Sequence, residues 1–542
     1  MGNEHYPVNR GRLGPKGENQ WWANNSVDRL KTPLIRHNGK LLSATWENAY
    51  SLLVEKTQEV LKRKGPSGLA LYHTGQAYLE DYYTISKITR AGLRMHHVDA
   101  NTRLCTATAE WSLIESFGSD GPPACQEDVD ITDVIVFIGR NSSETNTVFW
   151  ERVLEARRRN GTKIIEIDTR RDISDKMADL SLQPRSGTNV AVLNGIIHLL
   201  IKNTWIDPDY IRNHTIGFEE LKQTVSRYHP SFVEQITTIP SAKLAQCAEW
   251  IGTSKKTLTV LLQGVYQSLD ATAAATLVNL MHLIMGKIGK PGSGPFQHAG
   301  QPSAMSNRET GGAGFYPGYR NNSNPKHIAE MSRLWNVNEE ILPVGPQTFI
   351  TEIIQLIEQG EIDLFWVMFT NPAVSLPNRN RMISILKKPF LVVQDPFLSE
   401  TAELADLVLP TALWGEKEGT MTNLERRVNV LRKAVNPPYN LPSDFEILLE
   451  FSKRMGFKDR DGRPLISYMV RVTSKRGSIQ VPARITDAVR KGAIFIPFHY
   501  GTLTENQAAN VLTLETWDLV SKQPHFKNGA CRIEKIMGQE GG

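Results

Sequence analysis

The chain has 542 residues, of which 40% are hydrophobic and 22% are charged, and its formal net charge is +5. These fractions are ordinary for a globular protein and exclude a disordered chain, a coiled coil and a collagen-like fibre. The length exceeds what one hydrophobic core supports, so we expect several domains, on the order of three or four. So small a charge excess does not favour nucleic acid as a partner, which needs a concentrated basic surface, but it is compatible with an anionic ligand.

The sequence shows neither a membrane span nor an export signal. The most apolar candidate helix, Leu277–Met285, is interrupted by Asn279 and His282, whereas a span needs roughly eighteen consecutive apolar residues. The first residues lack the basic start and the apolar core of a secretory signal, and a twin-arginine signal is also missing. We therefore expect a cytoplasmic protein.

In chain order, short apolar runs alternate with amphipathic stretches, which is the pattern of βαβ units and parallel sheets. The runs lack a clean alternation, as is typical of strands covered on both faces. Six or more strand–helix units are more than one compact sheet with its helices holds. We therefore predict an α/β fold with two doubly wound, mostly parallel sheets. The predicted strands are 68–73, 134–138, 163–168, 258–262, 364–369 and 389–394, and the clearest predicted helices are 146–159, 190–201 and 271–285.

The two ends of the chain have residue patterns that differ from the βαβ pattern of the middle. The segment up to about Asn25 is polar and rich in Gly, Pro and Arg, and we expect it to pack as an arm. Short alternating runs at 468–473, 478–482 and 494–499, separated by Gly, Pro and Asp, predict a C-terminal β-barrel-like domain. We therefore predict an arm at 1–40, a discontinuous α/β domain at 41–130 and 335–455, a second α/β domain at 131–334 and the barrel-like domain at 456–542.

Five of the predicted strands end in polar or glycine residues. In open α/β sheets, ligands bind outside the carboxyl ends of the strands, where glycine lets the backbone approach a ligand. One such ending would be an ordinary strand terminator, but five favour a large, nucleotide-like ligand. None matches a GxGxxG motif or a P-loop, which disfavours ordinary NAD or ATP use. The endings are Gly139–Glu144, Asp168–Arg171, Gln263–Gln267, Thr370–Pro372 and Gln394–Pro396.

The four cysteines are scattered and include no CxxC pair, which excludes a disulfide framework and a locally ligated iron–sulfur cluster. Cys105 differs from Cys247 and Cys531, which we expect to be inert, because Arg103 precedes it and small residues follow it. Such surroundings favour a thiolate that acts as a nucleophile or as a soft-metal ligand. The segment 286–312 predicts a long polar loop, whose Gln, Asn, Arg and Glu side chains either line a polar pocket or belong to a flexible surface loop.

Several motifs together resemble the bis-molybdopterin guanine dinucleotide oxidoreductases of the DMSO reductase superfamily. Within that family the chain is similar to the catalytic subunits of bacterial assimilatory nitrate reductases, through Gly300–Met305 together with Arg308 and Glu309. The resemblance runs over nearly all of the chain. Its motifs are Pro7–Leu13, Pro15–Gly17, Asn101–Ala109, Phe117–Pro122, Gly289–Pro291, Gly300–Gly312, Asp395–Thr401, Ala405–Pro410, Glu416–Val428 and Ser521–Pro524.

The resemblance implies a molybdenum or tungsten ion held by bis-molybdopterin guanine dinucleotide and by the sulfur of Cys105. It also implies that Arg308 orients a small anionic oxo-substrate, with Thr106 and Gln301 beside it. The second α/β domain would bind dinucleotide, and the C-terminal domain would close over the cofactor. The implied cofactor-binding residues are Lys16, Arg103, Gly139, Asn141, Asp168, Gly187, Thr188, Asn189, Gln263, Gly264, Gln267, Asn371, Asp395, Thr401, Asp406, Asn510 and Lys522.

The departures from the family pattern concern the iron–sulfur cluster and the substrate. Gly14 stands where the family has a cysteine and three further cysteines are absent, so we expect no [4Fe-4S] cluster. Lys16, which the family places between cluster and pterin, would be left to bind a phosphate. Thr106 stands where nitrate reductases have Met, whereas formate dehydrogenases have His there and an Arg in place of Ala299, so formate oxidation is not expected.

These expectations lead to one main interpretation and two alternatives. The main interpretation is a nitrate-reductase-like enzyme that transfers oxygen atoms and receives its electrons from an external donor or a redox partner protein. The first alternative is an inactive family descendant that serves as a scaffold or binds the cofactor without turnover. The second is that the missing cysteines reflect a truncated or engineered chain.

Overall fold

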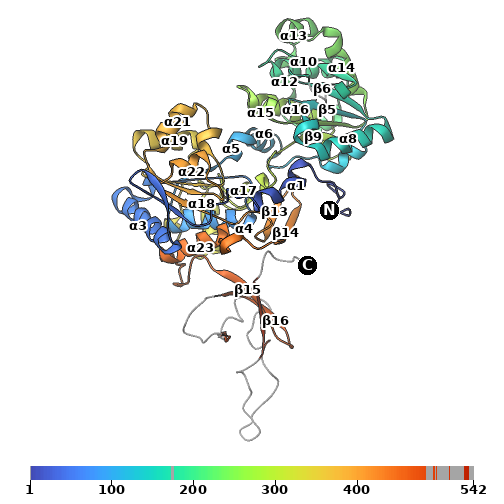
Figure 1. Cartoon of the computed structure of the whole chain (residues 1–542). Coiled ribbons are helices and arrows are strands. Elements are labelled where there is room, and N and C mark those ends of the chain that lie inside the picture. Colours follow the sequence, from blue (N-terminus) through green and yellow to red (C-terminus); the bar gives the residue numbers. More distant parts are fainter. Residues whose placement is uncertain are drawn as a thin grey trace.

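Figure 1 shows the computed structural model of the chain, which describes residues 2–171, 176–483, 492–494, 496, 512 and 530–535. Two α/β bodies lie beside each other, one built from the blue and orange parts of the chain and the other from its cyan and green middle, while β15 and β16 extend away from the first. In the described part of the chain, no helix combines the length and the apolarity that crossing a membrane requires.

The first body contains a seven-stranded sheet in the order β2-β1-β12-β11-β10-β3-β4. From β12 to β4 all neighbours are parallel, whereas β1 and β2 add an antiparallel edge. The three strands that the sequence predicts here are confirmed as β3, β10 and β11. The strands are β1 (Leu34–His37), β2 (Lys40–Ser43), β3 (Leu69–His73), β4 (His97–Ala100), β10 (Leu364–Met368), β11 (Phe390–Gln394) and β12 (Leu407–Leu409).

Helices cover both faces of this sheet. On one face, α3 (Trp46–Lys64), α4 (Leu79–Lys87) and α23 (Asp444–Arg454) contribute to one apolar core. On the other face, α19 (Ile350–Gln359), α21 (Arg379–Leu386) and α22 (Glu400–Leu404) contribute to a second core. Every residue of β3 and β10 is buried, which explains why these strands read as continuous apolar runs.

The second body contains a five-stranded, fully parallel sheet in the order β7-β6-β5-β8-β9. One face packs on α8 (Thr147–Asn160) and the other on α10, α14 and α16. The predicted helices are confirmed to within one residue at each end as α8, α10 and α16. The remaining bounds are β5 (Val134–Ile138), β6 (Lys163–Ile167), β7 (Leu180–Leu182), β8 (Thr257–Leu261), β9 (Gly294–Gln297), α10 (Asn189–Lys202), α14 (Ser241–Thr253) and α16 (Ala271–Ile284).

The segment 286–312 differs from the long polar loop that its composition predicts. It contains the edge strand β9 and the helix α17 (Ala304–Glu309), and Ala304–Arg308 are all buried. Its proline-rich start is compatible with a strand because Pro295 lies on an edge, where a missing N–H is tolerated. The alternative of a flexible surface loop is therefore wrong.

The C-terminal region contains a three-stranded antiparallel sheet in the order β16-β15-β17. Its strands are β15 (Tyr468–Thr473), β16 (Ser478–Ala483) and β17 (Arg532–Lys535), and the first two confirm predicted strands. Most of the predicted strand at 494–499 lies outside the described residues. Together with the two parallel sheets, this small sheet confirms the predicted fold class, in which a barrel-like domain follows two α/β units.

Shorter elements connect these parts. The first sheet takes strands from 34–100 and 364–409, and the second lies between them in the sequence. The predicted domain limits, 1–40, 41–130 with 335–455, 131–334 and 456–542, stay predictions. The connecting elements are α1 (Pro15–Asn19), α2 (Trp21–Asn24), α5 (Thr102–Cys105), α6 (Ala107–Phe117), α7 (Ser142–Thr145), α11 (Pro208–His214), α12 (Phe218–Val225), α13 (Pro230–Thr237), α15 (Gln263–Tyr266), α18 (Pro325–Trp335), α20 (Pro372–Ser375), β13 (Gly419–Thr422) and β14 (Val428–Leu431).

Candidate active site

Cys105 lies where the carboxyl edges of the two large sheets meet. It is the last residue of α5, the one-turn helix that follows β4 of the seven-stranded sheet. Gln263 follows β8 of the five-stranded sheet and donates from Nε2 to the Sγ of Cys105 at 3.0 Å. The thiol is partly exposed and forms no disulfide. A single side-chain contact therefore joins the strand ends of both sheets at this sulfur.

Glycines keep the space around the sulfur open. A Cβ added to Gly300 would lie only 3.8 Å from the Sγ of Cys105. Gly139 and Gly264, at the ends of β5 and β8, approach so closely that a Cβ on Gly139 would lie 2.7 Å from the Gly264 backbone. The N–H of Gly264 donates to the carbonyl of Gly139 at 2.9 Å. Only glycine permits this approach, and it leaves bare backbone at the sheet edge, which suits a large ligand.

Two amide side chains beside Cys105 keep unused hydrogen-bond acceptors. Gln301 donates to the Oδ1 of Asn101 at 3.0 Å, and the N–H of Gly75 donates to the same oxygen at 2.8 Å. In the part of the chain that the structure describes, the Oε1 atoms of Gln301 and Gln263 are buried without a hydrogen-bond partner. An unsatisfied buried acceptor costs about 1–3 kcal/mol. These acceptors therefore suit a ligand that donates N–H groups, as pterin and guanine rings do.

Arg308 is buried in α17 and forms an ion pair with Asp120, with Nη2 3.1 Å from Oδ1. Its Nη1 donates to the hydroxyl of Thr106 at 3.0 Å. Burial opposes its charge, but the charges of Asp120 and Glu110 outweigh that effect and raise the pKa of Arg308. Because a guanidinium has no acceptor, the Thr106 oxygen accepts here and its own proton remains to be donated. The structure thus brings together Cys105, Thr106 and Arg308, and Asp120 already balances the arginine charge.

Glu110 belongs to this site although it is not among the residues predicted from the sequence. It lies one helical turn after Thr106 in α6 and is buried. Burial raises the pKa of Glu110 to about 7; Arg308 lowers it and Asp120 raises it. An acidic residue among the small residues that open α6 was the available signal. We call Thr106, Glu110, Asp120 and Arg308 the Arg308 cluster.

Several predicted cofactor-binding residues lie at the carboxyl edge of the five-stranded sheet. Asn189, the first residue of α10, donates to the carbonyl of Gly264 at 3.2 Å, and Gln267 donates to the carbonyl of Leu104 at 2.9 Å. Their contacts connect this edge with the backbone around Cys105. The predicted residues that follow the strands of this sheet are Gly139, Asn141, Asp168, Gly187, Thr188, Asn189, Gln263, Gly264 and Gln267.

A second group lies at the carboxyl edge of the seven-stranded sheet. Asn371 follows β10, and its Oδ1 accepts from the hydroxyl of Thr401 at 2.6 Å. Asp395 follows β11 and accepts from the N–H of Phe397 at 2.9 Å, and burial raises its pKa to about 6. These three predicted residues are therefore found at one edge, as the sequence analysis expects for a ligand site.

Two other predicted cofactor-binding residues, Arg103 and Asp406, already have partners within the protein. The guanidinium of Arg103 lies over the ring of Phe349 at 4.2 Å and pairs with Asp99 at 3.4 Å. Asp406 precedes β12 and accepts at 2.9 Å from the N–H of Leu391, at the opposite end of the strands from Asp395. The structure therefore does not bring Asp406 to the carboxyl edge, since the crossover through α22 returns the chain to the amino ends of the strands before β12 begins.

The remaining predicted residues are outside the observed cluster. Lys16 is exposed in the short helix α1. Asn510 and Lys522 lie outside the described residues. For Gly14, which precedes α1, the backbone is extended, with φ −84°. That conformation is open to any residue, so the backbone does not explain why a glycine stands there.

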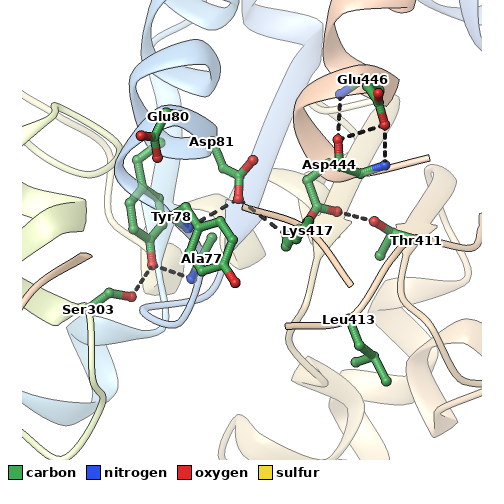
Figure 2. A network of polar contacts seen from close by, with 12 residues as sticks. Ala77, Tyr78, Glu80, Asp81, Ser303, Thr411, Leu413, Lys417, Asp444 and Glu446 are labelled. Atoms are coloured by element: carbon green, nitrogen blue, oxygen red, sulfur yellow. Dashed lines mark hydrogen bonds and ion pairs between the residues drawn. The ribbon is translucent and has the colours of Figure 1, made fainter. Parts of the chain in front are cut away.

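A second buried cluster joins the loop at 411–417 to α4 and α23 (Figure 2). Lys417 lies between Asp81 and Asp444, and Asp444 also accepts from the side chains of Gln394 at 2.8 Å and Thr411 at 2.5 Å. Burial raises the pKa of Asp81 to about 6. We call Asp81, Lys417 and Asp444 the Lys417 cluster. It holds three elements together where the loops of the seven-stranded sheet begin.

Comparisons with known proteins agree with this architecture. The family model described as "Molybdopterin oxidoreductase" matches residues 29–454, and the one described as "Molydopterin dinucleotide binding domain" matches 467–530. The nitrate reductase of Synechocystis sp. is 37% identical and covers 85% of this chain and 65% of its own. The F420-dependent formate dehydrogenase subunit alpha of Methanocaldococcus jannaschii is 32% identical over 84% of this chain and 67% of its own.

One further relative and one solved structure show how much of each protein this chain matches. The assimilatory nitrate reductase catalytic subunit of Bacillus subtilis is 33% identical over 83% of this chain and 64% of its own. Acetylene hydratase from Pelobacter acetylenicus shares the fold, with a TM-score of 0.68 at 21% identity over 83% of this chain and 64% of its own. The chain thus spans a little under two thirds of the length of the nitrate reductases that it matches. It belongs to the molybdopterin oxidoreductase family.

Proposed function

We propose that the chain is a molybdenum- or tungsten-dependent oxidoreductase of the nitrate-reductase type, which removes an oxygen atom from a small anionic oxo-substrate. The observation that carries the proposal is the position of Cys105, whose sulfur lies at the junction of two strand-end edges with Gln263 3.0 Å away. A soft thiolate beside open backbone is a suitable ligand for a soft, redox-active metal. Relatives named nitrate reductase support the substrate class.

The residues present fit the implied cofactor. The close pair Gly139 and Gly264 would accommodate a dinucleotide, and the unpaired oxygens of Gln263 and Gln301 would accept from its rings. Cys105 would be the protein ligand of the metal. When bound, the cofactor supplies a metal that exchanges oxygen atoms and electron pairs. By resemblance, Asn510 and Lys522 would close the site from the C-terminal domain.

The side chains near Cys105 have distinct tasks in this proposal. Arg308 fixes the rotamer of Thr106, because it donates to the hydroxyl oxygen. The hydroxyl proton is then left to bind an oxygen of the substrate. Asp120 neutralises Arg308 and fixes its guanidinium on the opposite side. Arg308 therefore acts chiefly by positioning Thr106, rather than as the free anion-binding cation that the resemblance implies.

We also propose that the protein has no [4Fe-4S] cluster of its own. Gly14 has no thiol at the position where the family has a cluster ligand. Electrons would then arrive from an external donor or a redox partner protein. Nucleic acid is not proposed as a partner, and a cytoplasmic location stays a prediction.

The test is an assay and an inventory of the purified holoprotein. With a reduced dye as donor, we expect turnover of nitrate or of another oxo-anion, molybdenum or tungsten together with pterin, and essentially no iron. Cys105→Ala should abolish turnover, whereas Cys125→Ala, at another partly exposed free cysteine, should not. Iron in cluster stoichiometry would contradict the cluster-free proposal. A fully loaded protein without turnover would favour the inactive descendant instead.

A further inference from the structure

Glu110 is a buried acid that the proposed function does not yet use. It lies five residues after Cys105, and its N–H donates to the carbonyl of Thr106 at 3.1 Å, within the first turns of α6. Residues four apart lie on the same face of a helix, so Glu110 and Thr106 share a face. Among the residues that the structure describes, its carboxylate has neither a hydrogen bond nor an ion pair, and only burial and the charges of its neighbours shift its pKa. Only 7% of the residue is exposed.

The charges that act on Glu110 come from four segments of the chain. Arg308 of α17 is paired with Asp120, which follows α6, and Arg103 of α5 is paired with Asp99 of β4. Each arginine already has its own carboxylate partner, so Glu110 is an additional acid between two ion pairs. Burial makes its charged form unfavourable and raises its pKa to about 7, although Arg308 lowers it. The side chain therefore exchanges a proton near neutral pH.

We propose that Glu110 is the proton-delivery residue of this site. The inference rests on the proposed function, since reduction of an oxo-anion consumes protons. Removing one oxygen takes two electrons from the external donor and two protons, and the oxygen leaves as water. Glu110 gives one of these protons to the departing oxygen through a water that bridges its carboxyl group to the Thr106 hydroxyl on the same helix face. The carboxylate regains its proton from solvent, which also supplies the second proton.

The positioning of Thr106 supports this route. Its oxygen accepts from Arg308, so the hydroxyl keeps its own proton to donate. A bridging water would then pass it a replacement from Glu110. Asp120 is unsuited to the task because both of its oxygens accept from Arg308, and Tyr319 donates to it as well at 3.0 Å. Asp99 is similarly committed to the N–H of Ile350 and to Arg103. Among these three acids, only Glu110 is uncommitted.

The test compares Glu110→Gln with Glu115→Gln in the cofactor-loaded protein. Glu115 lies in the same helix and is exposed, so it controls for the chemical change. With nitrate and a reduced dye at pH 7, we expect Glu110→Gln to lower kcat by about a hundredfold or more, the lower end of the range for general acid catalysis, with KM changed less than about threefold. In the wild type, kcat should fall as the pH rises through about 7, and Glu110→Gln should lose that dependence.

Infrared difference spectra recorded during a pH titration supply a readout without turnover. The wild type should show a protonated carboxyl band that disappears as the pH rises through about 7, and Glu110→Gln should lack it. An active wild type whose Glu110→Gln variant matches Glu115→Gln in kcat and pH profile would overturn the inference alone. A loaded wild type that reduces no oxo-anion would overturn the proposed function, and with it the role of Glu110, even if the band were present.

Discussion

The Lys417 cluster and the Arg308 cluster both place one buried cation between two acidic side chains, but they differ in how many of the acids are satisfied. In the Lys417 cluster both carboxylates accept hydrogen bonds, and Asp444 has partners from β11 and from the loop at 411–417. In the Arg308 cluster Asp120 takes the cation, and Glu110 has no partner among the described residues. The first arrangement joins elements of the fold, and the second leaves a proton-binding group beside Cys105.

The difference follows from where each cluster lies. A buried polar network stabilises a fold only when each member is paired, because an unpaired group keeps its full desolvation cost. The Lys417 cluster meets that condition, because each of its three members has a partner. The Arg308 cluster lies at the junction of the two sheets, where Gln263 and Gln301 also keep unpaired oxygens. The unpaired oxygens at this junction thus lie where the proposed ligand would bind.

The largest effect on stability should come from removing the Lys417 cation. Lys417→Met would leave Asp81 and Asp444 buried without a counter-charge, and breaking such a pair costs about 3–5 kcal/mol. Denaturant unfolding followed by fluorescence measures this loss. Lys453→Met is the matched control, because Lys453 lies in α23 with 75% of its side chain exposed. Equal stability of the two variants would show that the Lys417 cluster does not join the fold as we describe.

The next effect concerns the glycines at the junction. Gly139→Ala would place a Cβ 2.7 Å from the Gly264 backbone, at φ +57°, which should cost about 2–4 kcal/mol from overpacking and left-handed strain together. We also expect the variant to retain less pterin. Gly161→Ala has a similar φ, +70°, but open space around it, so it should cost only about 1–2 kcal/mol. Pterin content and melting temperature distinguish the two variants, and full pterin retention in Gly139→Ala would argue against a ligand at this edge.

The third effect, similar in size to the second, is the pH dependence that Glu110 gives to stability. Its pKa is raised in the folded protein, so the folded state holds a proton that the unfolded state has released between about pH 4.5 and 7. Stability from this group is therefore lost as the pH rises through that window. Between pH 4 and pH 8, the stability of Glu110→Gln should therefore rise relative to that of the wild type by about 3 kcal/mol. If the free energies of unfolding of the wild type and of Glu110→Gln changed equally with pH, the pKa of Glu110 would not be raised in the folded protein.

The sequence predicts the central strands well because they are buried on both faces. Runs such as Val134–Ile138 and Leu364–Met368 are apolar without interruption, and both became strands of the parallel sheets. The strands that the sequence analysis missed are short or carry polar residues. β12 has three residues, and β4 contains His97 and Asp99, whose places in the sheet depend on pairing with distant strands.

In the candidate site too, the features that depend on contacts between distant parts of the chain could not be predicted. Strand endings such as Gln263 could be predicted as ligand-binding positions, since carboxyl ends of parallel strands form one edge. That Gln263 contacts Cys105, 158 residues away, depends on how two sheets pack together and could not be predicted from local pattern. Glu110 was missed for the same reason, because its burial depends on α17 and on the segment after α6 rather than on its own helix.

The most direct test of the central claim is the metal content of Cys105→Ala measured beside Cys125→Ala. Both proteins would be expressed with molybdate and tungstate, purified in the same way and measured by mass spectrometry of the metals. We expect Cys125→Ala to keep the molybdenum or tungsten content of the wild type and Cys105→Ala to lose most of it while its circular dichroism remains native. A Cys105→Ala protein with full metal content and full turnover of the same oxo-anion would contradict the assignment of this sulfur as the metal ligand.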